Sequence, residues 1–368
     1  MSDRPLLLHR PADGPWRLAD RLHGLVATPG AAVISLISAG LALWLWWAAL
    51  SWLLIDATPP FAPGEACAAH RGACWPFLVE KTRFILFGTY PFDAQWRPAL
   101  TSLLLCALSV FAGLQAIGRA PRISALPTVA LWVAGLLAAF LLMGGGVFGL
   151  MPVDSTRWNG LPILLILSVV TIAVAFPLGM LLALARDQAT YPLMRRAAAA
   201  YIEIMRGVPM VTVLFVGIFV LPLMLPPSTA ISPVGATLIA LTLFHASYFA
   251  EDFRSGLQSL PVGQRESAKS LGLSYWQATA LVILPQAIHR SLPALLNSVI
   301  GAYKDTSLVV ILGIHDLTAT ARMAFNDPGW RGHALEAYAL VGFWFFVSCA
   351  FLSAIGRRLH ATRWHTMR

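Results

Sequence analysis

Long apolar stretches follow one another along this chain of 368 residues, separated by shorter polar segments. Several reach about 20 residues, the length of helix that crosses the ~30 Å hydrocarbon layer of a bilayer. Residues 161–186 are apolar on all sides, whereas barrel strands would alternate between apolar and polar positions. Because backbone groups inside a bilayer must pair within their own segment, the pattern predicts an all-α integral membrane protein. We predict eight transmembrane spans, at 31–55, 98–118, 126–148, 160–185, 200–225, 231–258, 286–311 and 335–356.

Composition excludes a soluble globule. Hydrophobic residues make up 58% of the chain, charged residues 12%, and the mean hydropathy is +0.70. Soluble domains contain about 25% charged residues, far more than this chain offers. The net charge of +9 does not indicate nucleic-acid binding, because the arginines lie in short segments beside the apolar runs and form no clustered basic stripe. We therefore predict no nucleic-acid partner.

Basic residues mark every second connection between the predicted spans, which is the bias that sets membrane orientation. The two short loops on the opposite side, 149–159 and 226–230, hold one basic residue between them. The pattern predicts a multi-pass protein of a bacterial inner membrane with both termini in the cytoplasm, although the outer segments 56–97 and 312–334 also contain arginine. The cytoplasmic arginines are Arg4, Arg10, Arg17, Arg21, Arg119, Arg122, Arg186, Arg195, Arg196, Arg357, Arg358, Arg363 and Arg368.

Four cysteines fall in two environments. Cys67 and Cys74 both lie in the first outer loop, where an oxidising compartment permits a disulfide; two free thiols are the alternative. Cys106 and Cys349 lie within spans and are interpreted as small packing residues. None of the four has the spacing of metal ligands, so no metal site is predicted.

Charged residues and glycine–proline features concentrate in the second half of the chain. We therefore predict an accessory region of three helices over 31–150, with the outer loop 56–97, and a working region over 160–358. Cytoplasmic tails over 1–30 and 359–368 complete the organisation. No internal repeat of the kind that builds secondary transporters is evident.

The polar segment 259–285 lies between two predicted spans on the cytoplasmic side. Its residues predict two short helices at an angle, a shape suited to docking against a partner, whereas a plain solvated loop is the alternative. The first helix is indicated by a first-turn proline at Pro261, a helix-forming stretch at 264–271 and a capping glycine at Gly272. The second helix is indicated by a capping box of Ser274 with Gln277, and Pro285 is expected to kink the entry into the next span.

The same segment resembles the EAA loop of ABC importer permeases. That loop reads Glu-Ala-Ala, three residues, Gly, nine residues, Ile, one residue, Leu-Pro. Here Glu266-Ser267-Ala268, Gly272, Val282 and Leu284-Pro285 stand at the same spacing, with Ser267 and Val282 as mild replacements.

Further segments are similar to the polar amino-acid uptake branch of these permeases, and the resemblance covers about 160–358. Asp252 departs from it, because the branch usually shows an apolar residue after Ala-Glu. The N-terminal spans with the cysteine-containing loop are similar to the larger permease subunit of general L-amino-acid transporters. The segments are RGVPMVTVLF at 206–215, AEDFRSGLQSLPVGQ at 250–264, LPQAIHRSLPALLNS at 284–298 and KDTSLV at 304–309.

The resemblance implies a type I permease core formed by the last five spans, in an importer with four kinds of part. A periplasmic binding protein would deliver an amino acid, and this chain and a sister permease would form the pathway. Two copies of an ATP-binding subunit would grip the coupling residues Glu266, Ser267, Ala268, Gly272, Leu284 and Pro285. ATP would be hydrolysed on that partner, and no cofactor is expected in this chain, which has no P-loop.

Ionisable residues inside the bilayer cost about 2.5–3.5 kcal/mol each on insertion, which makes them candidates for function. Arg206 and Glu251 each lie about ten residues from the cytoplasmic end of a predicted span, hence at similar depth, ~15 Å inside. Arg206 could hold an α-carboxylate through paired hydrogen bonds and Glu251 the ammonium, with Gly207 and Pro209 completing the predicted site. The alternative is a structural pair between Glu203 and Arg206, three residues apart on one helix.

Other polar residues in the spans are interpreted as structural. Lys304 and Asp305 are adjacent, point in different directions, and are predicted to fasten helices together. His245 is interpreted as a core hydrogen-bonding residue and His289 as an interfacial one. The alternative functions are a secondary transporter driven by an ion gradient and a membrane-embedded enzyme, for which no HExxH, serine or CxxC motif is present.

Overall fold

The computed structural model describes residues 28–69, 71–121, 123–187, 190–226 and 231–364, so most of the two terminal tails and Arg122 lie outside the described residues. Within these ranges the chain is helical and its only bridges are two isolated ones, which confirms the predicted all-α class. Seven described helices are long and apolar enough to cross a membrane, and a strongly bent helix pair makes an eighth candidate.

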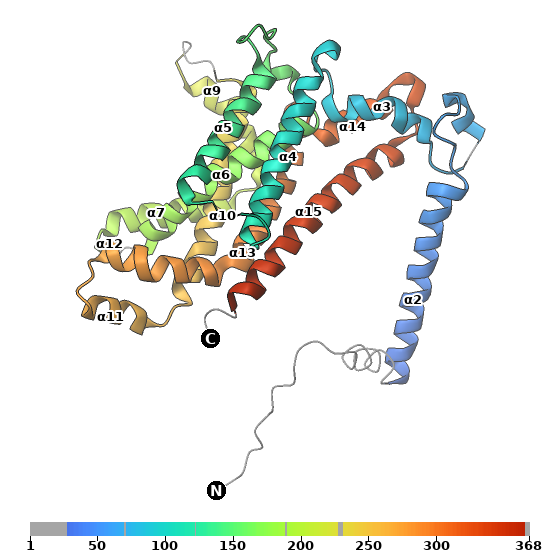
Figure 1. The fold of residues 1–368 in the computed structure, drawn as a ribbon. Helices are drawn as coiled ribbons and strands as arrows, with labels where there is room; N and C mark the ends of the chain where they lie inside the picture. Colours follow the sequence, from blue (N-terminus) through green and yellow to red (C-terminus); the bar gives the residue numbers. More distant parts are fainter. Residues whose placement is uncertain (1–27, 70, 122, 188–189, 227–230, 365–368) are drawn as a thin grey trace. The chain divides into compact units, whose positions relative to one another are not determined.

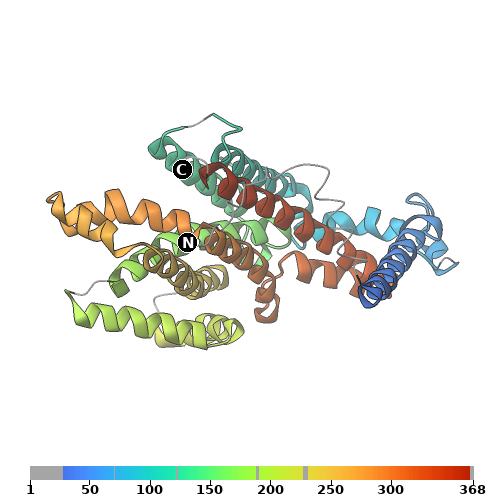
Figure 2. The same ribbon diagram turned by 90° about the horizontal axis from the view of Figure 1, so that it is seen from below.

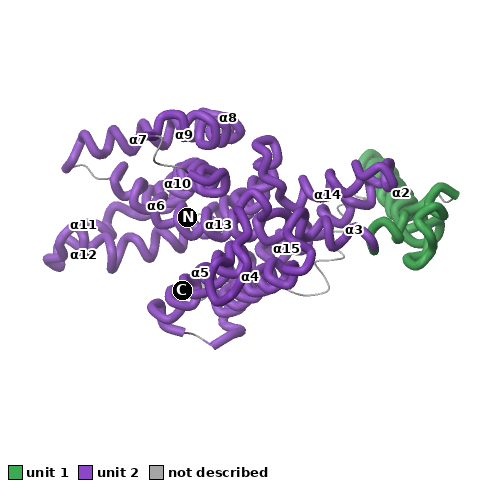
Figure 3. Tube along the Cα trace, turned by 90° about the horizontal axis from the view of Figure 1, so that it is seen from above, with its two compact units in different colours: residues 1–79 green, residues 80–368 purple. Residues whose placement is uncertain are grey.

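The chain divides into two compact units at Val79 and Glu80 (Figure 3). The first unit contains α2 (Pro29–Leu50), which a π-helical turn extends through Ile55. Thr28 caps this helix by accepting a hydrogen bond from the backbone N–H of Ala31 at 3.2 Å. After a 3-10 turn at Gly64–Ala69, helix α3 (Trp75–Phe87) begins in the first unit and runs into the second.

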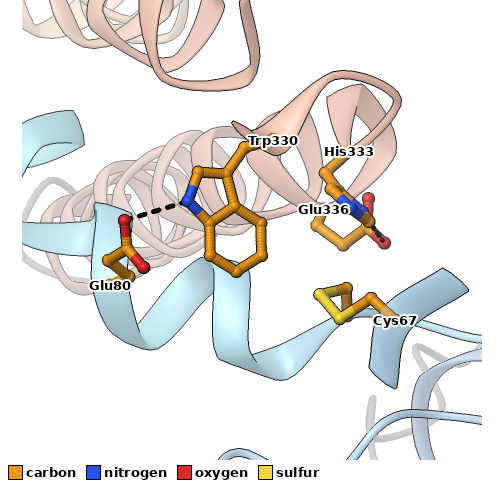
Figure 4. Close-up of a disulfide and its surroundings, with 6 residues drawn as sticks. Cys67, Glu80, Trp330, His333 and Glu336 are labelled. Carbon is orange, nitrogen blue, oxygen red and sulfur yellow. Dashed lines mark hydrogen bonds and ion pairs between the residues drawn. A yellow bond between two sulfur atoms is a disulfide. The ribbon is translucent and has the colours of Figure 1, made fainter. Parts of the chain in front are cut away.

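The loop after α2 is closed by covalent and polar contacts. Cys67 and Cys74 form a disulfide with their Cα atoms 5.4 Å apart (Figure 4). The indole N–H of Trp75 donates to the backbone oxygen of Leu53 at 3.0 Å, which ties the loop to the end of α2. The disulfide and this hydrogen bond thus connect both sides of the loop to each other and to the end of α2.

Labelling of intact cells tests both the topology and the redox state of this loop. Because the sequence places Cys67 and Cys74 outside the cell membrane as a disulfide, a membrane-impermeant thiol reagent should label the chain only after reduction. Cys106 and Cys349 lie within spans and should stay unlabelled in either condition. Ready labelling of Cys67 or Cys74 without reductant would contradict the bridge.

In the second unit, α6 and α10 form the centre of the bundle. Over half of the apolar window of each is buried, 56% and 67%, against 17–28% for the other described spans of this unit. Gly179 of α6 allows the close approach, because a Cβ there would lie 2.6 Å from that of Phe249 on α10. The spans of the unit include α4 (Trp96–Ala116), α5 (Ala125–Gly144), α6 (Leu161–Asp187), α10 (Pro233–Gln258), α13 (Leu284–Asp305) and α15 (Ala334–Trp364).

The predicted span 200–225 is interrupted by a sharp bend. The chain forms α7 (Pro192–Gly207) and then a bent continuation over Met210–Met224, at 105° to α7. Pro209 causes the break, because the residue before a proline is driven away from helical geometry, and Val208 is extended at φ −99° and ψ 136°. The continuation consists of α8 (Met210–Phe215), a π-helical turn at Val216–Val220 and α9 (Leu221–Met224).

The helix pair predicted over 259–285 is confirmed. Helix α11 (Val262–Ser270) and the short α12 (Tyr275–Ala278) project at one end of the second unit (Figure 1 and Figure 2). Gly272 between them has a left-handed φ of +76°, and Ser274 with Gln277 forms the capping box. The predicted kink at Pro285 takes the form of a π-helical turn at Thr279–Ile283, consistent with the N–H that proline lacks.

At the opposite end of α6, two helices that the sequence analysis missed form a polar layer. The part of α3 after Glu80 packs on α14 (Leu317–Asn326) and on the short 3-10 turn that follows it. Lys81 Nζ lies 2.7 Å from Asp327 Oδ2, and the indole N–H of Trp330 donates to Glu80 Oε1 at 2.9 Å (Figure 4). Within the second unit, the segment that leads into α14 thus meets the start of α6, where the N–H of Gly160 donates to the backbone oxygen of His315, whereas the helix pair meets the end of α6, where Arg265 pairs with Asp187.

The layer contains a buried carboxyl group. Asp316 caps α14 by accepting a hydrogen bond from the N–H of Ala319 at 3.0 Å, and its side chain is fully buried. Burial raises the pKa of the Asp316 carboxyl to about 6, although the hydrogen bond from Ala319 acts the other way. The neutral acid therefore stabilises the fold below the ordinary pKa of 3.8, and that contribution is lost as the pH rises through about 6.

Replacing Asp316 with asparagine is expected to remove this pH dependence. The neutral amide keeps an acceptor for Ala319, so stability at pH 8 should rise by about 1–3 kcal/mol, while stability at pH 4 stays nearly unchanged. Asp154→Asn is the control, since Asp154 is an exposed cap with a lowered pKa, held by the backbone N–H and hydroxyl of Thr156. Thermal unfolding of the purified protein at both pH values measures the effect, and equal shifts at pH 4 and pH 8 would contradict it.

Candidate functional site

The ends of three helices bring the predicted site residues together around Glu251 on α10. Arg206, in the last turn of α7, places Nη1 3.4 Å from Glu251 Oε2. Arg186, in the last turn of α6, places Nη1 3.5 Å from the same oxygen, and Arg254 Nε donates to Oε1 at 3.0 Å. Arg186 also pairs with Glu203 of α7 at 3.0 Å. These five residues, Arg186, Glu203, Arg206, Glu251 and Arg254, form what we call the arginine cluster.

The three arginines differ in how firmly they are held. Arg206 is the most exposed, with 40% of its side chain accessible, against 24% for Arg186 and 28% for Arg254. Its 3.4 Å contact with Glu251 exceeds the roughly 2.7–2.9 Å of a strong charge-assisted hydrogen bond. Its guanidinium also lies over the ring of Tyr248, 5.6 Å from the centroid. Arg206 is therefore the member with donors most available to a ligand.

Asp252 adds a third carboxylate beside the cluster. It is half-buried and interacts with Ser298 of α13 and with the charge of Arg206. Two turns earlier on α10, the buried His245 places Nε2 3.7 Å from Asp305 Oδ2 of α13, and this nitrogen has no hydrogen-bond partner among the described residues, so the core hydrogen bond predicted for His245 is not formed through it. Polar groups thus follow the side of α10 that faces α13, from Asp252 to His245.

The predicted meeting of Arg206 and Glu251 occurs in the structure. Arg206 lies in the last turn of α7, directly before the elbow formed by Gly207, Val208 and Pro209. The alternative pair is not formed as proposed, since Glu203 contacts Arg186 and Arg206 contacts Glu251. Arg186 is not among the predicted site residues, because its place at the end of an apolar run marks it only as an orientation residue.

Helix α11 is tied to the end of the bundle by polar contacts. Arg265 Nη2 lies 2.7 Å from Asp187 Oδ2, and the amide of Gln286 donates to Gln264 Oε1 at 3.0 Å. Asp187 follows Arg186 directly, so the last two residues of α6 contact α11 on one side and the arginine cluster on the other. The helix pair and the cluster therefore share one anchoring point.

Several apolar side chains of the helix pair have no cover within the described chain. Val262 is 72% exposed, Leu271 80% and Trp276 66%, although the first half of this segment is polar. Ala268 is buried, whereas Glu266 and Ser267 are exposed. Leu284 and Pro285 begin α13. An exposed apolar surface on a structured polar segment is typical of a docking site for another protein.

A bundle of helices long and apolar enough to cross a membrane, with a helix pair that projects at one end, fits a membrane subunit of a multi-component transporter. The chain belongs to the family of binding-protein-dependent transport system inner membrane components, whose family model matches residues 175–365. That match contains α7 to α15 and about half of α6. The family consists of transport subunits, so the chain is a transporter subunit and not an enzyme.

The similarity to individual relatives extends beyond the matched region. The chain is 38% identical to the inner membrane amino-acid ABC transporter permease protein YhdY of Escherichia coli K12, over 88% of each chain. It is 32% identical to the glutamate/glutamine/aspartate/asparagine transport system permease protein BztC of Rhodobacter capsulatus, over 91% of this chain and 87% of that one. Among solved structures, an amino acid ABC transporter with histidines is 25% identical, with a TM-score of 0.48, over 66% of this chain and 100% of that one.

Proposed function

We propose that this chain is the membrane-spanning permease of an ATP-driven amino-acid importer in a bacterial inner membrane, with both termini in the cytoplasm. The observation that carries the proposal is the similarity to two amino-acid permeases over 88% and 91% of this chain, which includes the N-terminal spans. The region 160–358 forms the permease core and the region 31–150 is accessory to it. Basic residues in the predicted cytoplasmic loops support this orientation.

The helix pair over 259–285 is the docking element for an ATP-binding subunit, present in two copies with a sister permease and a periplasmic amino-acid-binding protein. The spacing of Glu266, Ser267, Ala268, Gly272, Leu284 and Pro285 supports this role, as does the exposed apolar surface of the pair. The ion pair between Arg265 and Asp187 also supports this role, because a displacement of α11 by the ATP-binding subunit would be transmitted directly to the end of α6.

The amino acid binds at the arginine cluster, its carboxylate on Arg206 and its ammonium toward Glu251, with Gly207 and Pro209 setting the elbow that positions Arg206. The exposure and loose pairing of Arg206 support this assignment. Glu251 already pairs with the guanidinium groups of three arginines, so the ammonium group of the incoming amino acid replaces one of these arginines as a partner of Glu251. A cluster that only fastens α6, α7 and α10 together is the competing role.

Reconstitution decides between this function and a secondary transporter driven by an ion gradient. The chain, purified with the subunits that accompany it, is placed in liposomes with labelled amino acids and the binding protein. Uptake should require ATP on the side of the helix pair and should be absent with a non-hydrolysable analogue. Uptake driven by a proton or sodium gradient without ATP would overturn the proposal.

A further inference from the structure

A groove lies between α13 and α15, close to the end of the span Ala334–His360. Its volume is about 370 Å³, and none of the residues of the arginine cluster lines it. The two helices approach closely beneath it, because a Cβ on Gly356 would lie 2.8 Å from a methyl group of Leu296. The groove is therefore separate from the candidate substrate site and from the helix pair.

The lining of the groove combines apolar, polar and basic side chains. Leu296 and Ile300 of α13 form an apolar wall, next to Pro293 and the polar Asn297 of the same helix. On α15, Ser353 is polar, and Arg357 and His360 stand where the candidate span Ala334–His360 ends. Arg357 is exposed and donates one N–H to the hydroxyl of Ser353 at 2.8 Å. A guanidinium has five N–H donors, so the remaining ones can serve an anion at the mouth of the groove.

Neither helix that walls the groove supplies a carboxylate near its basic end. No aspartate or glutamate occurs from Ala337 to Arg368, a stretch that contains Arg357 and Arg358. On α13, none occurs from Leu284 to Lys304. Neither helix therefore offsets the charge of Arg357 at the mouth of the groove, which lies where the candidate span Ala334–His360 ends. Basic side chains at the end of a membrane span attract anionic headgroups.

We propose that this groove binds one anionic phospholipid, with the phosphate at Arg357 and His360 and an acyl chain along Leu296 and Ile300. A basic mouth at the membrane boundary selects a phosphate, and the apolar wall inside the span selects the attached chain. A free phosphate ion would satisfy the arginine but leave the apolar wall uncovered. The combination of both surfaces in one groove is what points to a lipid.

Lipid retention tests the proposal independently of transport. The full-length protein, with its accompanying subunits, is equilibrated in nanodiscs of phosphatidylcholine with a minority of phosphatidylglycerol, extracted in mild detergent, and weighed by native mass spectrometry. The wild type should retain one phosphatidylglycerol, whereas Arg357→Gln should reduce its occupancy several-fold. Gly356→Leu, which fills the groove from α15, should do the same where it folds. Inorganic phosphate at millimolar concentration should not displace the lipid.

Arg195→Gln is the matched control, because Arg195 is an exposed arginine at the start of α7, on a helix that does not line the groove. It should retain lipid like the wild type. Equal retention by Arg357→Gln and the wild type would overturn the proposal, as would displacement of the lipid by inorganic phosphate. Retention of another protein chain in place of the lipid would also overturn it. If the wild-type complex retains the lipid but does not transport amino acids, that result contradicts the proposed function and leaves the lipid site standing.

Discussion

Gly272→Val should abolish amino-acid uptake, while the protein still reaches the membrane and the ATP-binding subunit still hydrolyses ATP. Gly272 sits between α11 and α12 with a φ of +76°, a conformation that costs a residue with a side chain about 1–2 kcal/mol and a β-branched one more. No heavy atom lies within 4 Å of the position a Cβ would take, so the substitution acts on the backbone turn and not through a clash. The angle between the two helices should change, and with it their fit to the partner.

Gly263 provides the control for this experiment. It lies on α11, has nothing within 4 Å of its Cβ position, and does not have a positive φ, so Gly263→Val should transport nearly normally. Glu266→Lys tests the same surface by charge, since Glu266 is exposed and reversal should weaken docking. Uptake and ATP hydrolysis are measured side by side in liposomes. Normal uptake by both Gly272→Val and Glu266→Lys would show that this helix pair is not the coupling element.

Replacing Arg206 with lysine should lower uptake about tenfold to hundredfold. Lysine keeps the charge but cannot make two parallel hydrogen bonds to a carboxylate, and a hydrogen bond to a charged group contributes about 1.5–3 kcal/mol. Each 1.36 kcal/mol corresponds to about a factor of ten in rate. ATP hydrolysis stimulated by the binding protein should persist, because the cluster keeps its other two arginines on Glu251.

If Arg206 has only a structural role, the substitutions at this position should give different uptake rates. Glu251 would remain paired with Arg186 and Arg254 after Arg206→Leu, so a protein that needs the cluster only for packing should transport nearly normally with leucine at this position. Arg195→Leu, on the same helix, is the control for the loss of one positive charge from α7. Near-normal uptake by Arg206→Leu would end the assignment of this arginine to the substrate.

The membrane helices and the helix pair were predictable because their signals are local. Long apolar runs determine where a helix can cross a bilayer, and the capping residues Gly272, Ser274 and Gln277 act on their own backbone neighbours. The elbow at Pro209 was missed since hydropathy continues through it from α7 into α8, although Gly207-Val208-Pro209 carries a break signal of its own. Helices α3 and α14 were missed because they are short and mixed in polarity.

The membership of the candidate site depended on contacts between distant segments. Arg206 and Glu251 stood out because charged residues are rare in apolar surroundings, so their type alone drew attention. Arg186 had no such signal, since an arginine at the end of a span is the ordinary mark of orientation. Only the packing of α6 against α7 and α10 shows that it contacts Glu203 and Glu251.

The two charged residues that end α6 restrict how that helix can turn about its own axis. Neighbouring residues of a helix point about 100° apart, so Arg186 and Asp187 face different sectors. Arg186 is held toward Glu203 and Glu251, and Asp187 toward Arg265. A rotation of α6 about its own axis that shortened one ion pair would lengthen the other, so the two pairs together oppose such a rotation at this helix end. During the transport cycle, helix α6 should therefore tilt or slide together with α11 without rotating about its own axis.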